Sequence, residues 1–263
     1  MPQLLDSLLS CGLRRRPLVG AHRGASARAP ENTLAAFRAA IEDGSGLIEL
    51  DVRLTRDGRL AVMHDANTRR TTGVSRAVGK SDYKSLRDLD AGRLKGVQWA
   101  GEPVPELGDV FALVRDRLSV NVEVKGGVAA VREVARRAAE YGMAEKIIVS
   151  SFEPDVVRAA SALYPPLLTG LLLDQPVVDP VAAARKLGAS LVHVKHSLLT
   201  SQLADYAHRA GLAVLAWTVN VPEDMRRMQS IGVDAILSDD PRLLRDTLDR
   251  ADGSTKQGDE GLQ

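Results

Sequence analysis

The sequence predicts an α/β protein with a TIM (β/α)8 barrel fold and a small insertion after the second barrel strand. Short apolar runs typical of buried parallel strands alternate with amphipathic stretches through most of the 263 residues. The runs number eight, and eight βα units fit the ~250 residues that such a barrel needs. An open doubly wound sheet is the alternative, but no dinucleotide-binding G-x-G-x-x-G pattern follows any of the runs, which favours the barrel.

The predicted strands are short and mostly apolar, and the stretches between them repeat their apolar residues at helical spacing. Residues 32–44 and 128–142 are examples of such helical stretches, and both end in glycine, as helix C-termini often do. The eight predicted strands are PLVGA (17–21), LIELDV (47–52), VNVEVK (120–125), KIIVSS (146–151), LLTGLLL (167–173), SLVHVK (190–195), LAVLAWTV (212–219) and VDAILS (233–238).

One region interrupts the alternation of strands and helices. Asp57-Gly58 is a hairpin signal, so residues 60–63 are expected to form an antiparallel return strand. This strand begins an excursion over about 54–104, and a helix over 106–117 then completes the βα unit. We therefore expect one barrel domain over 17–250, an N-terminal extension over 1–16 and a disordered tail over 251–263.

Composition narrows the possible partners and the compartment. The chain has 35 basic and 34 acidic residues, a net charge of +1, so no global field draws it to nucleic acid or membrane. The only cysteine, Cys11, excludes an internal disulfide and fits a reducing compartment. The N-terminal residues have the wrong charge order for a signal peptide, and no apolar run reaches the ~18 residues of a membrane span. We expect a cytoplasmic protein with no nucleic-acid partner and no stable membrane association; the oligomeric state stays open.

Polar residues gather at the predicted carboxyl ends of the strands, where barrel enzymes place their active sites. Each of these residues could have a purely structural role, as a histidine in a turn, a member of a structural ion pair or an aromatic of the core. Unpaired charge inside a buried strand is costly in free energy, however. All of these residues are also predicted to lie at the same end of the barrel, its mouth. The residues are His22 and Arg23 on strand 1, Glu49 and Asp51 on strand 2, His64 after the return strand, Glu123 and Lys125 on strand 3, His193 and Lys195 on strand 6, and Trp217 on strand 7.

These residue types indicate phosphoryl chemistry. Glu49, Asp51 and Glu123 offer hard oxygen ligands, which suit Mg²⁺ or Ca²⁺ better than a soft metal. His22 and His64 can act as a general acid and a general base near neutral pH. Two cations, Arg23 and Lys125, can offset charge on phosphate oxygens. The predicted substrate is therefore a small phosphodiester.

An ordered set of motifs resembles the glycerophosphodiester phosphodiesterase family, which is related to the phosphatidylinositol-cleaving phospholipases. The matching pieces run in family order from about Leu18 to Leu248. They are HRGAS…APENT (22–33), IELDV…T-RDG (48–58), V-HD (62–65), RTTG (70–73), LDAG (89–92), VPELGDV (104–110), VEVK (122–125), SFEPDVV (151–157), WTVN (217–220) and GVDAILSDDP (232–241).

The resemblance implies a barrel that hydrolyses glycerophosphodiesters to glycerol 3-phosphate and an alcohol. It implies a divalent cation, Mg²⁺ or Ca²⁺, on the three carboxylates, catalytic histidines at positions 22 and 64, and phosphate contacts from Arg23 and Lys125. Trp217 matches an aromatic that lies against the glycerol. The relation to the phospholipases suggests attack by the glycerol 2-hydroxyl, with His22 as base and His64 as acid.

Three questions stay open in the sequence. A lysophospholipase D-type or other phosphodiester substrate is the first alternative, although the mostly polar residues 66–103 favour a water-soluble diester. A barrel that binds a phosphorylated ligand without catalysis is the second alternative. The roles of His193 and Lys195, and of Glu31 and Asn32 near the first helix, are also left open; Asn32 or Thr33 is expected to cap that helix.

Overall fold

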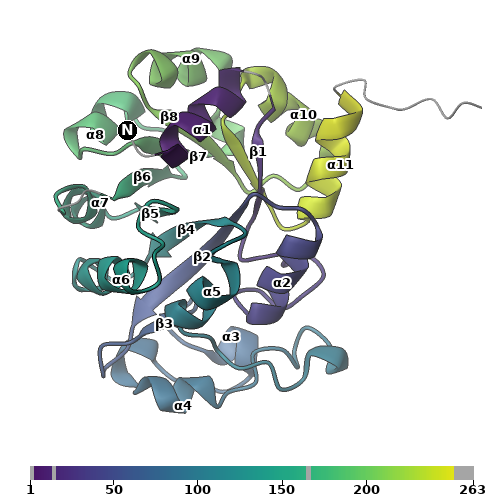
Figure 1. The fold of residues 1–263 in the computed structure, drawn as a ribbon, viewed down its shortest axis with the longest axis vertical. Coiled ribbons are helices and arrows are strands. Elements are labelled where there is room, and N and C mark those ends of the chain that lie inside the picture. The colour runs from purple at the N-terminus through teal and green to yellow at the C-terminus, as the bar shows by residue number, and fades with distance from the viewer. Residues whose placement is uncertain (1–2, 14–15, 164–166, 252–263) are drawn as a thin grey trace, which may run out of the picture.

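The computed structural model describes residues 3–13, 16–163 and 167–251. Within these residues, eight parallel strands close into a barrel surrounded by helices, so the fold prediction is confirmed (Figure 1). Closure runs through β1, which pairs with β2 on one side and with β9 on the other. The barrel strands are β1 (Leu18–Ala21), β2 (Leu47–Leu54), β4 (Ser119–Val124), β5 (Ile147–Ser151), β6 (Leu168–Leu173), β7 (Leu191–Lys195), β8 (Ala213–Trp217) and β9 (Ala235–Ser238).

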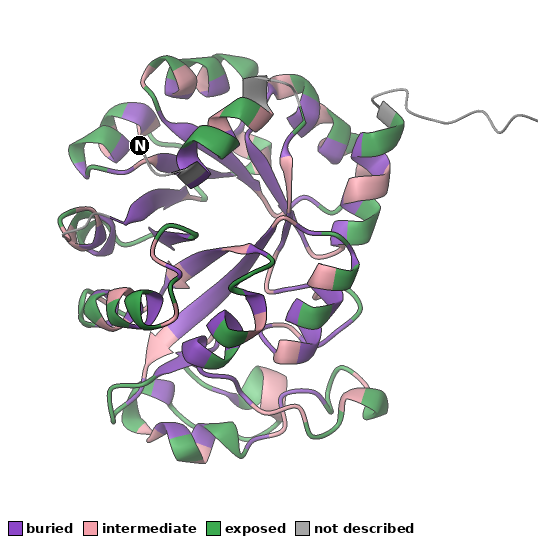
Figure 2. Ribbon diagram, viewed as in Figure 1, coloured by how far each residue is buried: buried purple, intermediate pink, exposed green. Residues whose placement is uncertain are grey.

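Helices cover the outer face of the barrel, and each turns its buried side to the strands (Figure 2). In β2, for example, Ile48, Leu50 and Val52 belong to the core shared with the helices, while the alternate residues face the barrel interior. The barrel helices are α2 (Leu34–Glu42), α5 (Leu107–Val114), α6 (Ala129–Glu140), α7 (Pro154–Ser161), α8 (Pro180–Lys186), α9 (Ser201–Arg209), α10 (Pro222–Ile231) and α11 (Pro241–Ala251), with a short 3-10 turn η3 (His196–Leu198) after β7.

The excursion after β2 forms a small layer of its own beside the barrel. Its first element, β3 (Leu60–Val62), pairs antiparallel with the end of β2, as the Asp57-Gly58 hairpin signal predicts. The rest is helical turns over a small core that includes Tyr83 and Leu86. Helix α5 ends earlier than expected, at Val114, where the buried face gives way to charged residues. The elements of the excursion are α3 (Arg69–Thr72), η1 (Val78–Lys80), α4 (Tyr83–Arg87) and η2 (Val97–Trp99).

A buried carboxylate ties the hairpin to the barrel helices. Glu106, at the start of α5, accepts hydrogen bonds from Arg59 of the hairpin (Nε to Oε1, 2.8 Å) and from Arg137 of α6 (Nη2 to Oε1, 2.6 Å). Glu106 is only 5% exposed, so its charge needs these two partners. The excursion is therefore fixed to the barrel at its base.

The N-terminal residues add a helix, α1 (Gln3–Leu13), to the amino-terminal end of the barrel. Leu4, Leu5 and Leu8 are buried in one cluster with residues that begin barrel strands, among them Leu47 and Leu191. The extension therefore closes the end of the barrel opposite the polar mouth. The tail predicted over 251–263 lies outside the described residues except for Ala251, which ends α11. Among the helices of the described ranges, none has the length and apolar character needed to cross a membrane.

We predict that Leu8→Ala destabilises the protein without changing its chemistry. Leu8 is fully buried, and removing a buried leucine side chain costs about 2–5 kcal/mol of unfolding free energy. The exposed neighbour Ser7 supplies the control, because Ser7→Ala should stay within about 0.5 kcal/mol. Urea unfolding of both variants measures the difference. Equal unfolding free energies would show that α1 is not part of the core.

A second stability prediction concerns pH. His208 of α9 lies 2.9 Å (Nε2 to Oδ2) from the buried Asp234, and this hydrogen bond, followed by the carboxylate charge, raises the pKa of His208 above its usual 6.5. The charged pair therefore stabilises the fold fully below about pH 6.5, and the stabilisation is lost as pH rises through the folded-state pKa. We expect wild type to lose about 1 kcal/mol more than His208→Gln between pH 6 and 9 in denaturant titrations. If the unfolding free energies of wild type and His208→Gln changed in parallel with pH, this prediction would be contradicted.

Candidate active site at the barrel mouth

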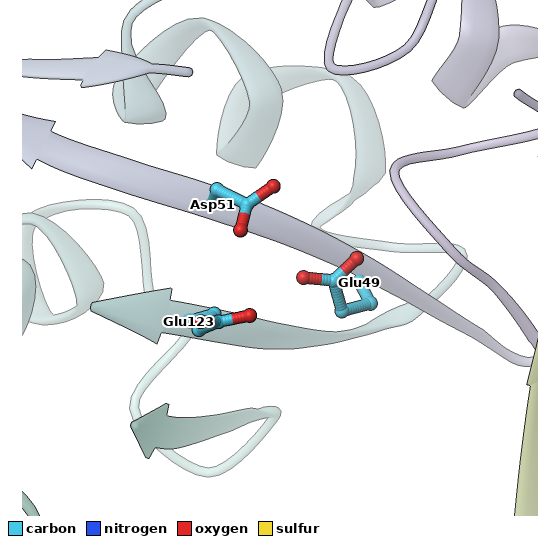
Figure 3. A group of neighbouring side chains, drawn as sticks. All are labelled: Glu49, Asp51 and Glu123. Atoms are coloured by element: carbon cyan, nitrogen blue, oxygen red, sulfur yellow. The ribbon is translucent and has the colours of Figure 1, made fainter. Parts of the chain in front are cut away.

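Three carboxylates meet inside the barrel mouth. Glu49 and Asp51 lie two residues apart on β2, so both side chains point inward, and parallel register sets Asp51 beside Glu123 of β4. Figure 3 shows the three side chains turned toward one another from these adjacent strands. Their ligand atoms lie within 4.8 Å of one another, so the group could hold a metal ion. The prediction that these residues converge is therefore met in the structure.

The electrostatics of this cluster fit a cation. Burial, followed by repulsion from Asp51 and Glu123, raises the pKa of Glu49 well above its usual value, and burial and Asp51 raise the pKa of Glu123 to about 7. Glu49 Oε1 and Asp51 Oδ1 are buried and have no hydrogen-bond partner among the described residues. Buried carboxylate oxygens that repel one another and are not fully hydrogen-bonded are suited to a hard metal ion, which would relieve both costs.

Two basic side chains border the carboxylates. The backbone N–H of Arg23 donates to Glu49 Oε2 (2.9 Å), and its guanidinium Nε lies 3.4 Å from Asp51 Oδ2. Lys125 Nζ lies 3.3 Å from Asp51 Oδ1 and also donates to Glu123 Oε1. Burial alone would raise the pKa of Asp51, but these two cations help to lower it below its usual value, so Asp51 stays ionised at neutral pH.

Asn32 supports Asp51 from the loop before α2. Its Nδ2 donates to Asp51 Oδ2 (2.8 Å), and its Oδ1 accepts from the Asp51 backbone N–H (3.2 Å). Thr33 rather than Asn32 caps α2, because Thr33 Oγ1 accepts from the Ala36 N–H. The open question about Asn32 is therefore answered: it orients a carboxylate of the cluster.

His22 is held by a residue that the sequence reasoning missed. Its Nδ1 lies 2.7 Å from Asp239 Oδ1, and its Nε2 lies 4.0 Å from Glu49 Oε2. Burial would raise the pKa of Asp239, but hydrogen bonds from His22, Asn220 and Ser26 lower it to about 2. Asp239 thus stays ionised and fixes the imidazole with Nε2 toward the carboxylates. Its place just after the last barrel strand is the sequence signal that could have found it.

His64 approaches the cluster from the excursion. The Met63 N–H donates to the Asp51 carbonyl (2.9 Å), and the residue that follows, His64, lies next to β2. Its Nδ1 is 2.7 Å from Asp65 Oδ1, so the other ring nitrogen, Nε2, is the one available to exchange a proton with a ligand. Burial lowers the pKa of His64, while the charge of Asp51 and the hydrogen bond with Asp65 act in the opposite direction. The hairpin thus brings the second histidine to the mouth, as expected.

Aromatic side chains lie at the carboxyl ends of β5 and β8. Trp217 ends β8 and meets Phe152 edge to face, with 5.6 Å between ring centroids. Lys125 Nζ lies 5.8 Å from the centroid of Phe152. The sequence reasoning named Trp217 but not Phe152, which lies just beyond β5 and is 39% exposed. Exposed aromatic faces of this kind can pack against the carbon atoms of a ligand.

The two uncertain residues of β7 differ in depth. His193 is completely buried inside the barrel, and burial lowers its pKa to about 3, so the ring is neutral. Its Nε2 packs over Gly170, where an added Cβ would lie 2.4 Å away. Lys195 is exposed and stands beside Trp217 in the register of β7 and β8. Of this pair, only Lys195 reaches the mouth.

A cleft of about 510 Å³ opens beside the first histidine, which is large enough for a small ligand. It joins barrel residues to the excursion, from which Lys95 contributes. Its lining includes His22, Arg23, Ser26, Lys95, Asn220 and Asp239.

Comparison with known proteins matches this arrangement to one family. Residues 22–243 match the model of the Glycerophosphoryl diester phosphodiesterase family. A glycerophosphodiester phosphodiesterase of Caldanaerobacter subterraneus subsp. tengcongensis is 38% identical over 234 residues, which cover 87% of this chain and 96% of the relative.

Two solved structures are also similar over nearly their whole length. A phosphodiesterase of Oleispira antarctica, in complex with the product sn-glycerol-3-phosphate, superposes with a TM-score of 0.81 at 28% identity and covers 90% of this chain and 99% of its own. A glycerophosphodiester phosphodiesterase of Agrobacterium tumefaciens has a TM-score of 0.79 at 28% identity, with 87% and 98% covered. The chain therefore belongs to the glycerophosphoryl diester phosphodiesterase family, enzymes that hydrolyse glycerophosphodiesters.

Proposed function

We propose that this enzyme hydrolyses water-soluble glycerophosphodiesters to sn-glycerol 3-phosphate and an alcohol at the barrel mouth. The observation that carries the proposal is the buried cluster of Glu49, Asp51 and Glu123, bordered by basic side chains and flanked by two histidines. The product bound to the similar phosphodiesterase from Oleispira antarctica supports the same reaction. The negatively charged diester would lie against these groups.

The three carboxylates would hold one divalent cation, and Mg²⁺ or Ca²⁺ suits their hard oxygens. When bound, such an ion neutralises charge on the phosphate and makes the phosphorus more open to attack. Arg23 and Lys125 would contact the non-bridging oxygens, since each cation already lies within 3.4 Å of Asp51. Trp217 would lie against the glycerol carbons, which its position beside Phe152 supports.

The two histidines would share the proton transfers. In the assignment suggested by the family resemblance, His22 Nε2 takes the proton of the glycerol 2-hydroxyl as its oxygen attacks phosphorus. The bond from phosphorus to the alcohol oxygen breaks, and His64 Nε2 donates a proton to that oxygen. Water then opens the cyclic phosphate with the proton roles reversed. Asp239 and Asp65, each 2.7 Å from the Nδ1 of one ring, would keep both Nε2 atoms directed at the substrate.

A second candidate substrate is a lysophospholipid. The excursion exposes Leu94 (60%) and Val97 (85%), and Phe152 is exposed at the mouth, so an acyl chain would find apolar contacts there. The polar lining of the cleft beside His22 favours the water-soluble diester instead.

We predict that purified protein releases glycerol 3-phosphate from glycerophosphocholine, and does so faster than it turns over lysophosphatidylcholine. A chelator, His22→Ala or Glu123→Ala should each reduce kcat/KM by about 100-fold or more, because each removes a group that acts on the reacting atoms. The controls are His196→Ala and Glu145→Ala, which alter a histidine and a glutamate outside the cluster. Activity that survives both the chelator and the two site variants would leave the proposed mechanism without support, and no release from any diester would favour a non-catalytic binding barrel.

We also predict that a divalent cation stabilises the fold through the carboxylate cluster. Mg²⁺ or Ca²⁺ at one hundred times its Kd should add about 2.7 kcal/mol to the unfolding free energy. Glu123→Gln removes one charged ligand and should reduce this gain, whereas Glu145→Gln should keep it. Thermal unfolding of apo protein with each ion measures the effect. An identical gain in wild type and Glu123→Gln would place the binding of the cation elsewhere.

A further inference from the structure

Arg70 of the excursion binds two carboxylates at once. Its Nε and Nη2 donate to Asp65 (2.7 and 3.2 Å), and its Nη1 and Nη2 donate to Glu31 (2.7 and 2.8 Å). Glu31 lies in the loop before α2, on the barrel, while Asp65 and Arg70 lie in the excursion. The guanidinium therefore bridges the boundary between these two parts of the molecule.

Both carboxylates lead on to groups of the active site. Asp65 Oδ1 is also 2.7 Å from Nδ1 of His64, the histidine assigned a proton transfer. Glu31 Oε1 also accepts from Nη1 of Arg23 (2.9 Å), whose guanidinium contacts Asp51. Arg70 is thus linked, through one carboxylate each, to the proposed proton-transfer group His64 and the proposed phosphate-binding group Arg23, which belong to different parts of the fold.

This arrangement needs the shape of arginine. Two forked contacts in different directions use four of the five N–H groups of a rigid planar guanidinium, and a lysine ammonium cannot supply that pattern. The three charged side chains are 22 to 47% exposed, and ion pairs with such exposure add little stability. The effect of these contacts on geometry is larger than their effect on stability, because each pair of hydrogen bonds prevents a carboxylate from rotating.

We propose that Arg70 is a positioning residue for the reaction, and that it sets the orientations of His64 and Arg23 through Asp65 and Glu31. The inference rests on the proposed function for its kinetic consequence. Without Arg70, Asp65 is free to turn away from the His64 ring, and among the described residues the Arg23 guanidinium is left as the hydrogen-bond donor to the Glu31 carboxylate. Both groups then lose the alignment that the substrate requires.

The ionisation of the two carboxylates agrees with this role. The hydrogen bonds from Arg70 are the largest contribution that lowers the pKa of Asp65 to about 2. Burial would raise the pKa of Glu31, but Arg70 and Arg23 together lower it. Both carboxylates therefore stay charged at neutral pH and remain acceptors throughout the reaction.

The test compares Arg70→Ala and Arg70→Lys with Arg69→Ala, which removes the adjacent exposed arginine of the same helix. We expect Arg70→Ala to lower kcat about 10- to 100-fold with a smaller change in KM, because misplaced groups slow the chemical step. Arg70→Lys should recover part of the loss, and Arg69→Ala should stay within about twofold of wild type. Asp65→Asn should cost much less in the Arg70→Ala background than in wild type, since the two residues act in one chain of contacts.

Two results would overturn the inference. One is an Arg70→Ala variant whose kcat equals that of Arg69→Ala; the other is additive effects of Arg70→Ala and Asp65→Asn on kcat. A readout without turnover separates this inference from the proposed function. The ¹⁵N shifts of the His64 ring should report a proton held on Nδ1 in wild type and a changed tautomer mixture in Arg70→Ala. Unchanged shifts contradict the positioning role even if the enzyme turns over every diester, and changed shifts support it even if no diester is cleaved.

Discussion

The site depends on the repulsion among three carboxylates that the barrel forces together. Parallel register between β2 and β4 leaves Asp51 and Glu123 side by side, with Glu49 on the same face of β2. In a buried, low-dielectric position this repulsion is expensive: burial first, and the neighbouring carboxylates second, raise the pKa values of Glu49 and Glu123. A bound cation would remove this cost, so the arrangement is suited to holding a metal ion.

The surrounding residues are arranged around that repulsion, even at the expense of backbone strain. Among the described residues, Arg23 and Asn32 are the non-glycine residues with a left-handed backbone, and each has φ of 57°. Such conformations cost about 1–3 kcal/mol unless neighbouring contacts compensate them. Here the Arg23 N–H reaches Glu49, and the Asn32 amide makes two bonds with Asp51. The strain thus falls on the loop that presents donors to the carboxylates.

The residues of the candidate site that lie on strands could be predicted from the sequence. Glu49 and Asp51, two apart in an apolar run, could only share one face, and Glu123 and Lys125 repeat the pattern on the next barrel strand. Contacts between residues far apart in the chain could not be predicted from the sequence. His22 and Asp239 are 217 positions apart, and Glu31 and Arg70 are 39 apart. The core role of α1 was missed for a related reason, because a short leucine-rich helix shows its packing partner only in three dimensions.

The excursion contributes side chains to the proposed active site, although it lies outside the barrel. His64 comes from it, Arg70 links it to Glu31, and Lys95 donates to the Ser26 carbonyl at the rim (2.7 Å). Residues 66–103 hold eight basic and four acidic side chains, a net charge of +4, while the whole chain carries +1 and the remainder therefore −3. A positive segment beside the mouth would attract an anionic diester, and the carboxylates at the centre would attract a cation. The separation of charge between excursion and barrel would thus bring two ligands of opposite sign to one place.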